Sequence, residues 1–369
     1  MLTLFLIILS LMTYQANSLT CSTNKWAKQV TTGTAPNQLS AHTMVEYQNE
    51  FYISGGFVED FLGTTYTFQN KLFKYNINTA VWSLLWSGSG TGPSKRAFHG
   101  SIFVGNELYI YGGSTFDWGY TNITVDGTFW KWKSSSGWTQ ITATPNPGPR
   151  TDFELTVLDG KIYLFAGFVD SSITMKNDLW RYDPSTNAWT QLIADGNSGS
   201  PHKRHSHQFR ANPDDGYIYM SMGKIGGGVH INDTWVYHPN VNSWADITPT
   251  YYNDNINPAL DDFYASDFVD GQFILYGGQQ GTGGVSGCNA PYPQNPIDKT
   301  YLFDPSSQVW TEKPFLSVFP PPLVRHAGAK TIVSNSPDDV YFFVHGGYSF
   351  PSCPPGQVWN NDIWCLEIV

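Results

Sequence analysis

Charged residues are scarce in this 369-residue chain. Asp, Glu, Lys and Arg make up 14% of the sequence, against about a quarter in an average globular protein. The net charge is −10, and no run of Lys or Arg is longer than Lys203-Arg204. Because binding to phosphates requires a clustered basic surface, this composition argues against nucleic acid as a partner.

Long apolar segments are also nearly absent. The run from Leu2 to Met12 is followed by Ala16-Asn17-Ser18, a small-x-small pattern typical of signal-peptide cleavage. The run is short for a membrane span, and no second apolar segment of about twenty residues follows it. We therefore predict a secretory signal over residues 1–18 and a secreted or lumenal mature chain, with an uncleaved anchor as the alternative.

Cysteine is rare as well. The chain has four cysteines, Cys21, Cys288, Cys353 and Cys365. An even number in a secreted chain predicts two disulfide bonds. The number alone leaves three pairings open.

Aromatic residues and glycine, in contrast, are abundant and periodic. The stretch Leu108-Tyr109-Ile110-Tyr111-Gly112-Gly113 has five counterparts in the chain. Self-similarity with a period of about fifty residues indicates a repeat architecture. In each repeat a variable loop, an aromatic strand, a short turn and a lone tryptophan follow the glycines, so we expect four short strands in one antiparallel sheet. The tryptophans are Trp26, Trp82, Trp138, Trp189, Trp244 and Trp310.

This combination of double glycine, aromatic strand and lone tryptophan resembles the Kelch repeat, which builds one blade of a β-propeller. Only the third and fourth repeats depart from it, with Ala166 and Met222 in place of the first glycine. The resemblance implies an all-β, six-bladed Kelch β-propeller as a single domain over residues 19–369, with four antiparallel strands per blade. The sixth repeat lacks its tryptophan strand, and Trp26 supplies one at the N-terminus. We expect the N-terminal strand to complete the C-terminal blade and so close the ring.

The predicted closure favours one cysteine pairing. An alignment of Trp26 with Trp189 places Cys21 and Cys365 beside each other in the closing blade. Cys288 and Cys353 fall in the loops after the double glycines of blades 5 and 6. We therefore expect the pairs Cys21–Cys365 and Cys288–Cys353.

Arginines recur before the first strand of the repeats, which in a propeller lines the central channel. Counting back 17 residues from the second glycine gives Leu39, Arg96, Arg150 and Asp261, and longer turns place Arg204 and Arg325 at the matching position. Three residues further on stand His42, His99, Phe153, His207, Tyr264 and Gly328.

Two interpretations of these arginines remain open. Guanidinium groups pair with carboxylates in bidentate geometry, so an Arg/His rim at the channel mouth could bind an acidic ligand. Alternatively, each arginine pairs with a neighbouring blade, with Asp261 meeting Arg204 or Arg325, and has a purely structural role.

The sequence offers little for metal binding or catalysis. His202, His205 and His207 form the densest titratable cluster, but a third metal ligand of suitable spacing is not evident, so no metal or cofactor is predicted. Kelch-type catalysts use either a Cys–Tyr copper centre or an iron pattern, Glu-x-x-x-Asp-x-x-x-His. The iron pattern is absent, and we expect all four cysteines to form disulfide bonds. An enzyme similar to sialic acid mutarotase would need an acidic base at the mouth, for which Glu154 and Asp262 are the candidates.

We predict a secreted, non-enzymatic binding scaffold that engages a protein or an acidic glycan or peptide through its loop face and rim. The alternative is a secreted carbohydrate-active enzyme. The predicted ligand-binding residues are Arg96, Arg150, Arg204, Arg325, His42, His99 and His207.

Two N-glycosylation sequons occur, Asn122-Ile123-Thr124 and Asn232-Asp233-Thr234. Asn122 follows a double glycine in a loop, so we expect it to be glycosylated. Asn232-Asp233 repeats the pair Asn177-Asp178 before a third strand. This recurrence indicates a turn role for Asn232.

Overall fold

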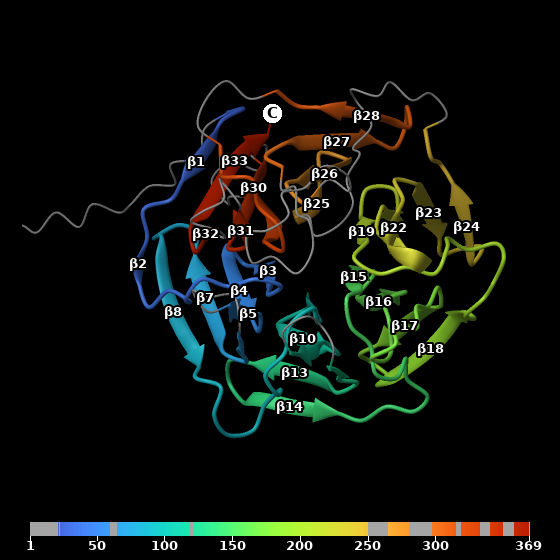
Figure 1. Cartoon of the computed structure of the whole chain (residues 1–369), viewed down its shortest axis with the longest axis horizontal. Helices are drawn as coiled ribbons and strands as arrows, with labels where there is room; N and C mark the ends of the chain where they lie inside the picture. Colours follow the sequence, from blue (N-terminus) through green and yellow to red (C-terminus); the bar gives the residue numbers. More distant parts are fainter. Residues whose placement is uncertain are drawn as a thin grey trace, which may run out of the picture.

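Six blades, each with four antiparallel strands, are arranged around a central axis, and one further strand joins the sheet of blade 1 (Figure 1). The blades follow one another in chain order, and this arrangement confirms the predicted all-β, six-bladed propeller. The computed structural model describes residues 21, 23–59, 65–117, 122–249, 265–279, 297–314, 319–332, 340–349 and 358–368.

In each blade the first strand lies nearest the axis and the fourth lies outermost. Blade 1 consists of β3 (Thr43–Tyr47), β4 (Glu50–Ser54), β7 (Leu72–Asn76) and β8 (Val81–Trp86). Blade 2 consists of β9 (Gly100–Val104), β10 (Glu107–Tyr111), β13 (Phe129–Lys133) and β14 (Gly137–Ile141). Blade 3 consists of β15 (Glu154–Leu158), β16 (Lys161–Phe165), β17 (Leu179–Asp183) and β18 (Ala188–Ile193).

The other three blades repeat this order. Blade 4 consists of β19 (Gln208–Asn212), β20 (Tyr217–Ser221), β23 (Thr234–His238) and β24 (Ser243–Asp246). Blade 5 consists of β25 (Ala265–Val269), β26 (Gln272–Tyr276), β27 (Thr300–Asp304) and β28 (Val309–Glu312). Blade 6 consists of β29 (Ala327–Ile332), β30 (Val340–His345), β33 (Ile363–Ile368) and β1 (Trp26–Lys28).

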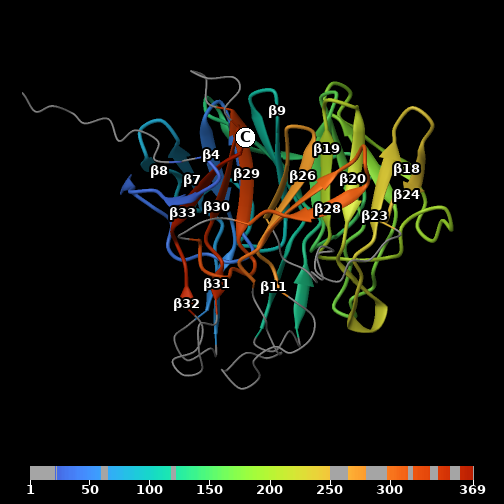
Figure 2. The same ribbon diagram turned by 90° about the horizontal axis from the view of Figure 1, so that it is seen from above.

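Short hairpins follow the second strands of blades 1, 2, 4 and 6, and β31 and β32 extend from one side of the ring (Figure 2). We call this side the hairpin face. The hairpins are β5 (Phe57–Glu59) with β6 (Tyr66–Phe68), β11 (Ser114–Phe116) with β12 (Ile123–Val125), β21 (Lys224–Ile225) with β22 (Val229–His230), and β31 (Tyr348–Ser349) with β32 (Val358–Trp359). A 3-10 turn, η2 (Gly226–Gly228), joins β21 to β22, and β2 (Thr32–Gly33) pairs in parallel with β8.

The alternation of the second strands explains how one sequence pattern builds the whole ring. Successive strand residues point to opposite faces of a sheet. In β10, Leu108 and Ile110 join the core shared with blade 1, whereas Tyr109 and Tyr111 join the core shared with blade 3. Every blade is therefore apolar on both faces, because both faces are covered by neighbouring blades.

The tryptophan of the fourth strand reinforces each interface between blades. Trp189 packs against Tyr182 of its own blade, with ring centroids 5.2 Å apart, and against Tyr111 of blade 2 at 5.5 Å. Aromatic pairs of this kind contribute about 0.5–1.5 kcal/mol beyond their buried area. Trp26 makes the equivalent contact with Tyr276 of blade 5 at 4.7 Å.

The ring closes as the sequence predicts. Strand β1 pairs antiparallel with β33, with Ala27 opposite Cys365, and so supplies the outermost strand of blade 6. Cys21 and Cys365 form a disulfide bond with Cα atoms 5.5 Å apart. The first and last described strands are thus held together by a ladder and a covalent bond.

Several predictions concern residues outside the described ranges. These are the signal segment 1–18, the pair Cys288 and Cys353, Asp261, Asp262 and Tyr264. Among the described segments, none forms a helix that is long and apolar enough to cross a membrane.

Candidate functional site

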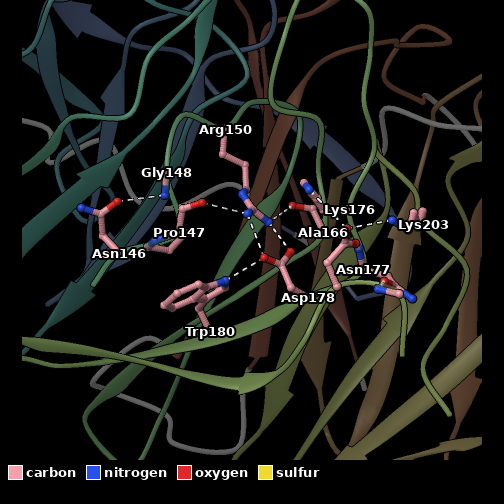
Figure 3. Close-up of polar contacts among 12 residues, drawn as sticks. Asn146, Pro147, Gly148, Arg150, Ala166, Lys176, Asn177, Asp178, Trp180 and Lys203 are labelled. Atoms are coloured by element: carbon pink, nitrogen blue, oxygen red, sulfur yellow. Dashed lines mark hydrogen bonds and ion pairs between the residues drawn. The ribbon is translucent and has the colours of Figure 1, made fainter. Parts of the chain in front are cut away.

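The predicted rim arginines are among the most deeply buried side chains of the protein. Arg150 is 1% exposed. Its Nη1 and Nη2 donate to Oδ1 and Oδ2 of Asp178 at 2.5 and 3.0 Å (Figure 3). Nη1 also donates to the Ala166 carbonyl at 3.0 Å, and Trp180 Nε1 donates to Asp178 Oδ2 at 2.7 Å. The carboxylate is therefore fully engaged by groups of its own blade.

Blades 2 and 4 repeat this arrangement. Arg96 pairs with Asp126 at 2.9 Å and donates to the Gly112 carbonyl at 2.6 Å. Burial lowers the pKa of Arg96, and the Asp126 carboxylate opposes that effect. Arg204 pairs with both oxygens of Asp233, at 2.6 and 2.7 Å, and donates to the Met222 carbonyl at 2.8 Å.

The backbone at the same positions links neighbouring blades. The N–H groups of Gly56, Gly113 and Gly167 each donate to the carbonyl of the arginine in the next blade, as Gly113 does to Arg150 at 2.8 Å. In blade 6 the acceptor is Leu323, which receives the N–H of Gly278 at 2.8 Å. The predicted alignment of Arg325 with Arg150 was therefore wrong by two residues. The matching residue of blade 6 is an apolar one.

These contacts favour the structural interpretation of Arg96, Arg150 and Arg204 over the predicted ligand-binding role. Their guanidinium groups are 0–2% exposed and already hold an internal carboxylate. A ligand at the channel mouth could reach them only by breaking those pairs. Each of these arginine side chains pairs with an aspartate of its own blade. The contact with the neighbouring blade, which was predicted for the side chain, is made by the arginine's backbone carbonyl.

The predicted histidines, His42, His99 and His207, are buried too. Together with His326 we call them the histidine belt. His42, His99, His207 and His326 are 1–6% exposed. His326, and not Gly328 as predicted, occupies the position in blade 6, because its ring lies against Gly277 as the ring of His99 lies against Gly55. Burial lowers the pKa of His99, His207 and His326 to about 3. These rings are neutral packing elements at neutral pH.

A further set of residues surrounds the channel mouth, and we call it the mouth ring. Each member lies two positions after the arginine of its blade, or after the leucine that takes the arginine's place in blades 1 and 6. Their backbone N–H groups donate from blade to blade, as in Asp152 to Phe98 at 2.9 Å and Ser206 to Asp152 at 3.1 Å. The described members of this ring have φ between 53° and 56°. Sequence reasoning missed this ring because residues other than glycine and asparagine rarely signal a positive φ. Its members among the described residues are Ala41, Phe98, Asp152, Ser206 and Arg325.

Arg325 is the one predicted arginine placed at the mouth. With the rest of the mouth ring it lines a small cavity of about 90 Å³, which Arg96, Arg150 and Arg204 do not line. Its guanidinium lies over the rings of Phe98 and Tyr348, 5.4 and 5.8 Å from their centroids. Cation–π contacts at this distance help to orient the guanidinium group.

Comparison with known proteins now decides the family. The KLHDC2/KLHL20/DRC7 Kelch-repeats domain matches residues 12–136 and 65–278. The chain belongs to the Kelch-repeat family.

Individual Kelch proteins are similar over long stretches at low identity. The leucine-zipper-like transcriptional regulator 1 homolog of Drosophila melanogaster is 23% identical over 79% of this chain and 30% of its own length. Kelch domain-containing protein 3 of Rattus norvegicus is 25% identical over 50% of this chain and 48% of its own length. Kelch domain-containing protein 10 of Bos taurus is 23% identical over 67% of this chain and 56% of its own length. The chain thus covers less than two thirds of each of these relatives.

The Kelch scaffold also determines what the candidate catalytic groups do. Glu154, proposed beside Arg150, instead pairs with Arg210 of blade 4, Nη1 to Oε2 at 2.7 Å. The second candidate, Asp262, lies outside the described residues. Glu154 is therefore engaged in an ion pair between blades 3 and 4.

The histidine cluster of blade 4 is divided between different environments. His202 is exposed, and His207 packs against Phe165 with ring centroids 5.4 Å apart. His205 Nδ1 lies 2.8 Å from Asp152 Oδ2, which also accepts from Ser206 Oγ at 2.7 Å. Burial alone would raise the pKa of Asp152, but these hydrogen bonds lower it. Within the described ranges, no three His, Cys, Asp or Glu side chains are placed to hold a metal ion.

The two sequon asparagines lie in different settings on the Kelch blades. Asn122 is exposed at the start of β12, where its backbone N–H donates to Asp117 Oδ1 at 2.8 Å. Asn232 is half-buried and directly precedes Asp233, the partner of Arg204. Glycosylation of Asn122 stays a prediction.

Proposed function

We propose that this Kelch propeller is a non-catalytic binding domain that holds a protein partner on its hairpin face. The observation that supports the proposal most directly is the construction of this face. Hairpins and loops of variable sequence rise from a base that the arginine–aspartate pairs and the backbone links between blades hold together. A rigid base with variable loops suits recognition, because little order has to be imposed on binding.

Two exposed apolar side chains on this face could contact the partner. Ile173, in the loop after the glycine of blade 3, is 42% exposed, and Val229 in β22 is 53% exposed. Apolar contacts at the centre of an interface, surrounded by polar groups, provide most of its binding energy.

Arg325 at the channel mouth would supply a charged contact in the proposed interface. The residue is partly exposed, and its guanidinium lies over the rings of Phe98 and Tyr348. A partner segment with an acidic side chain or an acidic glycan would pair with it. The proposal therefore keeps the predicted preference for acidic ligands, but Arg325 and not the buried arginines would bind the acidic group.

An array of peptides and glycans of graded charge, followed by affinity measurement of the strongest ligand, tests the proposal. Arg325→Gln and Ile173→Asp should each weaken binding by about tenfold or more. Val241→Asp is the matched control, because Val241 is 70% exposed but lies in the turn between β23 and β24, away from the hairpin face. Binding that survives both face variants, or turnover of a sugar ligand, would overturn the proposal.

We further propose that the protein acts in the secretory pathway or outside the cell. The Cys21–Cys365 bond supports this, because disulfides of this kind persist in oxidising compartments. Expression in secreting cells should give a mature N-terminus near Leu19 and a Cys21–Cys365 peptide on non-reducing mass mapping. Retention of residues 1–18 with both thiols free would contradict it.

A further inference from the structure

The central channel contains a second and larger cavity that the proposed partner site does not use. Its volume is about 380 Å³. It extends from His42 and His326, below the mouth ring, to Pro213 in the turn between β19 and β20. This cavity therefore reaches toward the side of the ring opposite the hairpin face.

Charged side chains of alternating sign line this cavity on five consecutive blades. Going round from blade 3 through blade 6 to blade 1, they are Glu154, Arg210, Asp267, Lys330 and Glu46. Among the described residues, three carboxylates therefore face two cations, and one negative charge is in excess. The excess charge lies in a confined channel, where water screens it less than at an open surface.

The partners of these groups show where the excess lies. Arg210 is paired with Glu154 at 2.7 Å and also donates to the Ser266 carbonyl at 3.1 Å. Asp267 accepts the backbone N–H of Lys330 at 2.8 Å. Glu46 accepts the N–H of Asn49 at 2.8 Å and a long bond from the Thr331 hydroxyl at 3.4 Å. No described cation forms an ion pair with Glu46.

The surroundings of Glu46 favour the protonated form of its carboxyl group. Burial raises its pKa, and the Asp267 carboxylate adds to this effect. The hydrogen bonds from Asn49 and Thr331 and the charge of Lys330 oppose the rise without cancelling it. A cation placed beside Glu46 would remove this penalty.

Blade 2 closes the remaining part of the cavity with an apolar wall. Ile102 and Phe103 are partly exposed, and Phe103 stacks on Tyr47, next to Glu46, with ring centroids 4.6 Å apart. Ser101 also lines the cavity. It is 8% exposed, and its hydroxyl has no hydrogen-bond partner among the described residues. A buried hydroxyl without a partner is costly, and a ligand or water could satisfy it.

We propose that this cavity binds a small organic amine, with its ammonium group beside Glu46 and its apolar body against Ile102 and Phe103. The excess carboxylate selects the cation, and the aromatic wall favours it further through cation–π attraction. The volume suits a ligand of roughly ten to twenty heavy atoms, at the small end of ordinary ligand sites. This site is separate from the partner site, so either proposal can fail alone.

Isothermal titration calorimetry with phenethylamine, phenethyl alcohol and phenylacetate tests the charge requirement. The three probes share an aromatic body and differ in charge at pH 7.5. The amine should bind saturably and at least about tenfold more tightly than the alcohol or the carboxylate. Equal binding of amine and alcohol, or no binding of the amine, would overturn the proposal.

Variants and proton release locate the site. Glu46→Gln keeps the acceptor for Asn49 but removes the charge, and it should weaken amine binding by about tenfold. Glu50→Gln is the control, because Glu50 pairs with Lys74 and does not line the cavity. In mildly acidic buffer, amine binding to the wild type should release a proton from Glu46, and Glu46→Gln should abolish that release. An unchanged proton release or affinity in Glu46→Gln would exclude Glu46 as the amine's partner and so overturn the proposal.

Discussion

At the scale of single residues, the buried arginines connect two levels of structure. The side chain of Arg150 binds Asp178 and the Ala166 carbonyl within one blade, while its backbone carbonyl accepts the Gly113 N–H of the blade before. Removal of both charges of a buried pair is often tolerated, whereas removal of one leaves an uncompensated charge.

Arg150→Met should therefore lower the free energy of unfolding by about 3–5 kcal/mol. Lys131→Met, which removes a partly exposed ion pair with Glu107, should cost less than about 1 kcal/mol. Urea unfolding monitored by tryptophan fluorescence measures both. The double variant Arg150→Met/Asp178→Asn should recover part of the loss, and equal losses in Arg150→Met and Lys131→Met would contradict the interpretation.

Substitution of Gly112 tests whether neighbouring blades approach too closely for a side chain at this position. Gly112 has φ of 64°, and a Cβ would lie 2.3 Å from the Arg150 carbonyl oxygen. Gly105, with φ of 58°, has open space around the same atom. Gly105→Ala should cost about 1 kcal/mol from backbone strain alone, and Gly112→Ala clearly more. Thermal unfolding of the two variants compares them, and equal shifts in Tm would argue against a steric role.

The residue scale is also where sequence-based prediction was least complete. The arginines were recognised, but their partners were not, because Asp126, Asp178 and Asp233 follow loops of variable length. The position of Arg325 was predicted by counting residues along the repeat. Because the first turn of blade 6 is longer, the count selected Arg325 when the matching residue is Leu323, two positions earlier. The hydrogen bond from Gly278 to Leu323 reveals the true register, and the position of His326 against Gly277 agrees with it.

At the scale of elements, prediction succeeded because each strand carries its own signal. Alternating apolar residues before a double glycine identify the second strand, and a lone tryptophan identifies the fourth. A sixth blade without its tryptophan therefore predicted the pairing of β1 with β33, and this pairing placed Cys21 beside Cys365. The mouth ring had no such signal, since its residues range from Ala41 to Arg325 in type.

Loss of the covalent link should loosen the closing blade. The disulfide spans 344 residues, and a native disulfide typically contributes about 2–4 kcal/mol. Wild-type protein should therefore lose thermal stability on addition of reductant, whereas Cys21→Ala/Cys365→Ala should start lower and respond less. Cys288→Ala/Cys353→Ala serves as the control. Because it keeps Cys21 and Cys365, it should still lose thermal stability when reductant is added. A double variant at 21 and 365 that matches oxidised wild type would refute this role.

At the scale of the whole molecule, the histidine belt and His345 make stability depend on pH. Burial lowers the pKa of His99, His207, His326 and His345 to about 3. Unfolding lets each take up a proton near pH 6.5. Stability is therefore complete above pH 6.5 and falls as the pH drops toward 3, by roughly 2 kcal/mol for each histidine at pH 5.

Denaturant midpoints at pH 7.5, 6 and 5 should fall steeply for the wild type. His207→Phe should flatten this dependence, because Phe153 already fills the same position in blade 3 without a titrating group. His202→Asn, at an exposed site, should leave it unchanged. Identical pH profiles for His207→Phe and wild type would show that the belt does not control acid stability.

The closing blade also determines when the ring can form during synthesis. Of the described strands, β1 is made first and β33 last, so Trp26 has no sheet to join until nearly all of these strands have left the ribosome. Blades 1 to 5 can form in turn from local contacts, but the sixth requires a contact between distant parts of the chain, which is slow to form. Until then the ring is open, its strand edges can recruit other chains, and Cys21 is without its partner. An unpaired thiol at residue 21 would therefore mark every unfinished molecule.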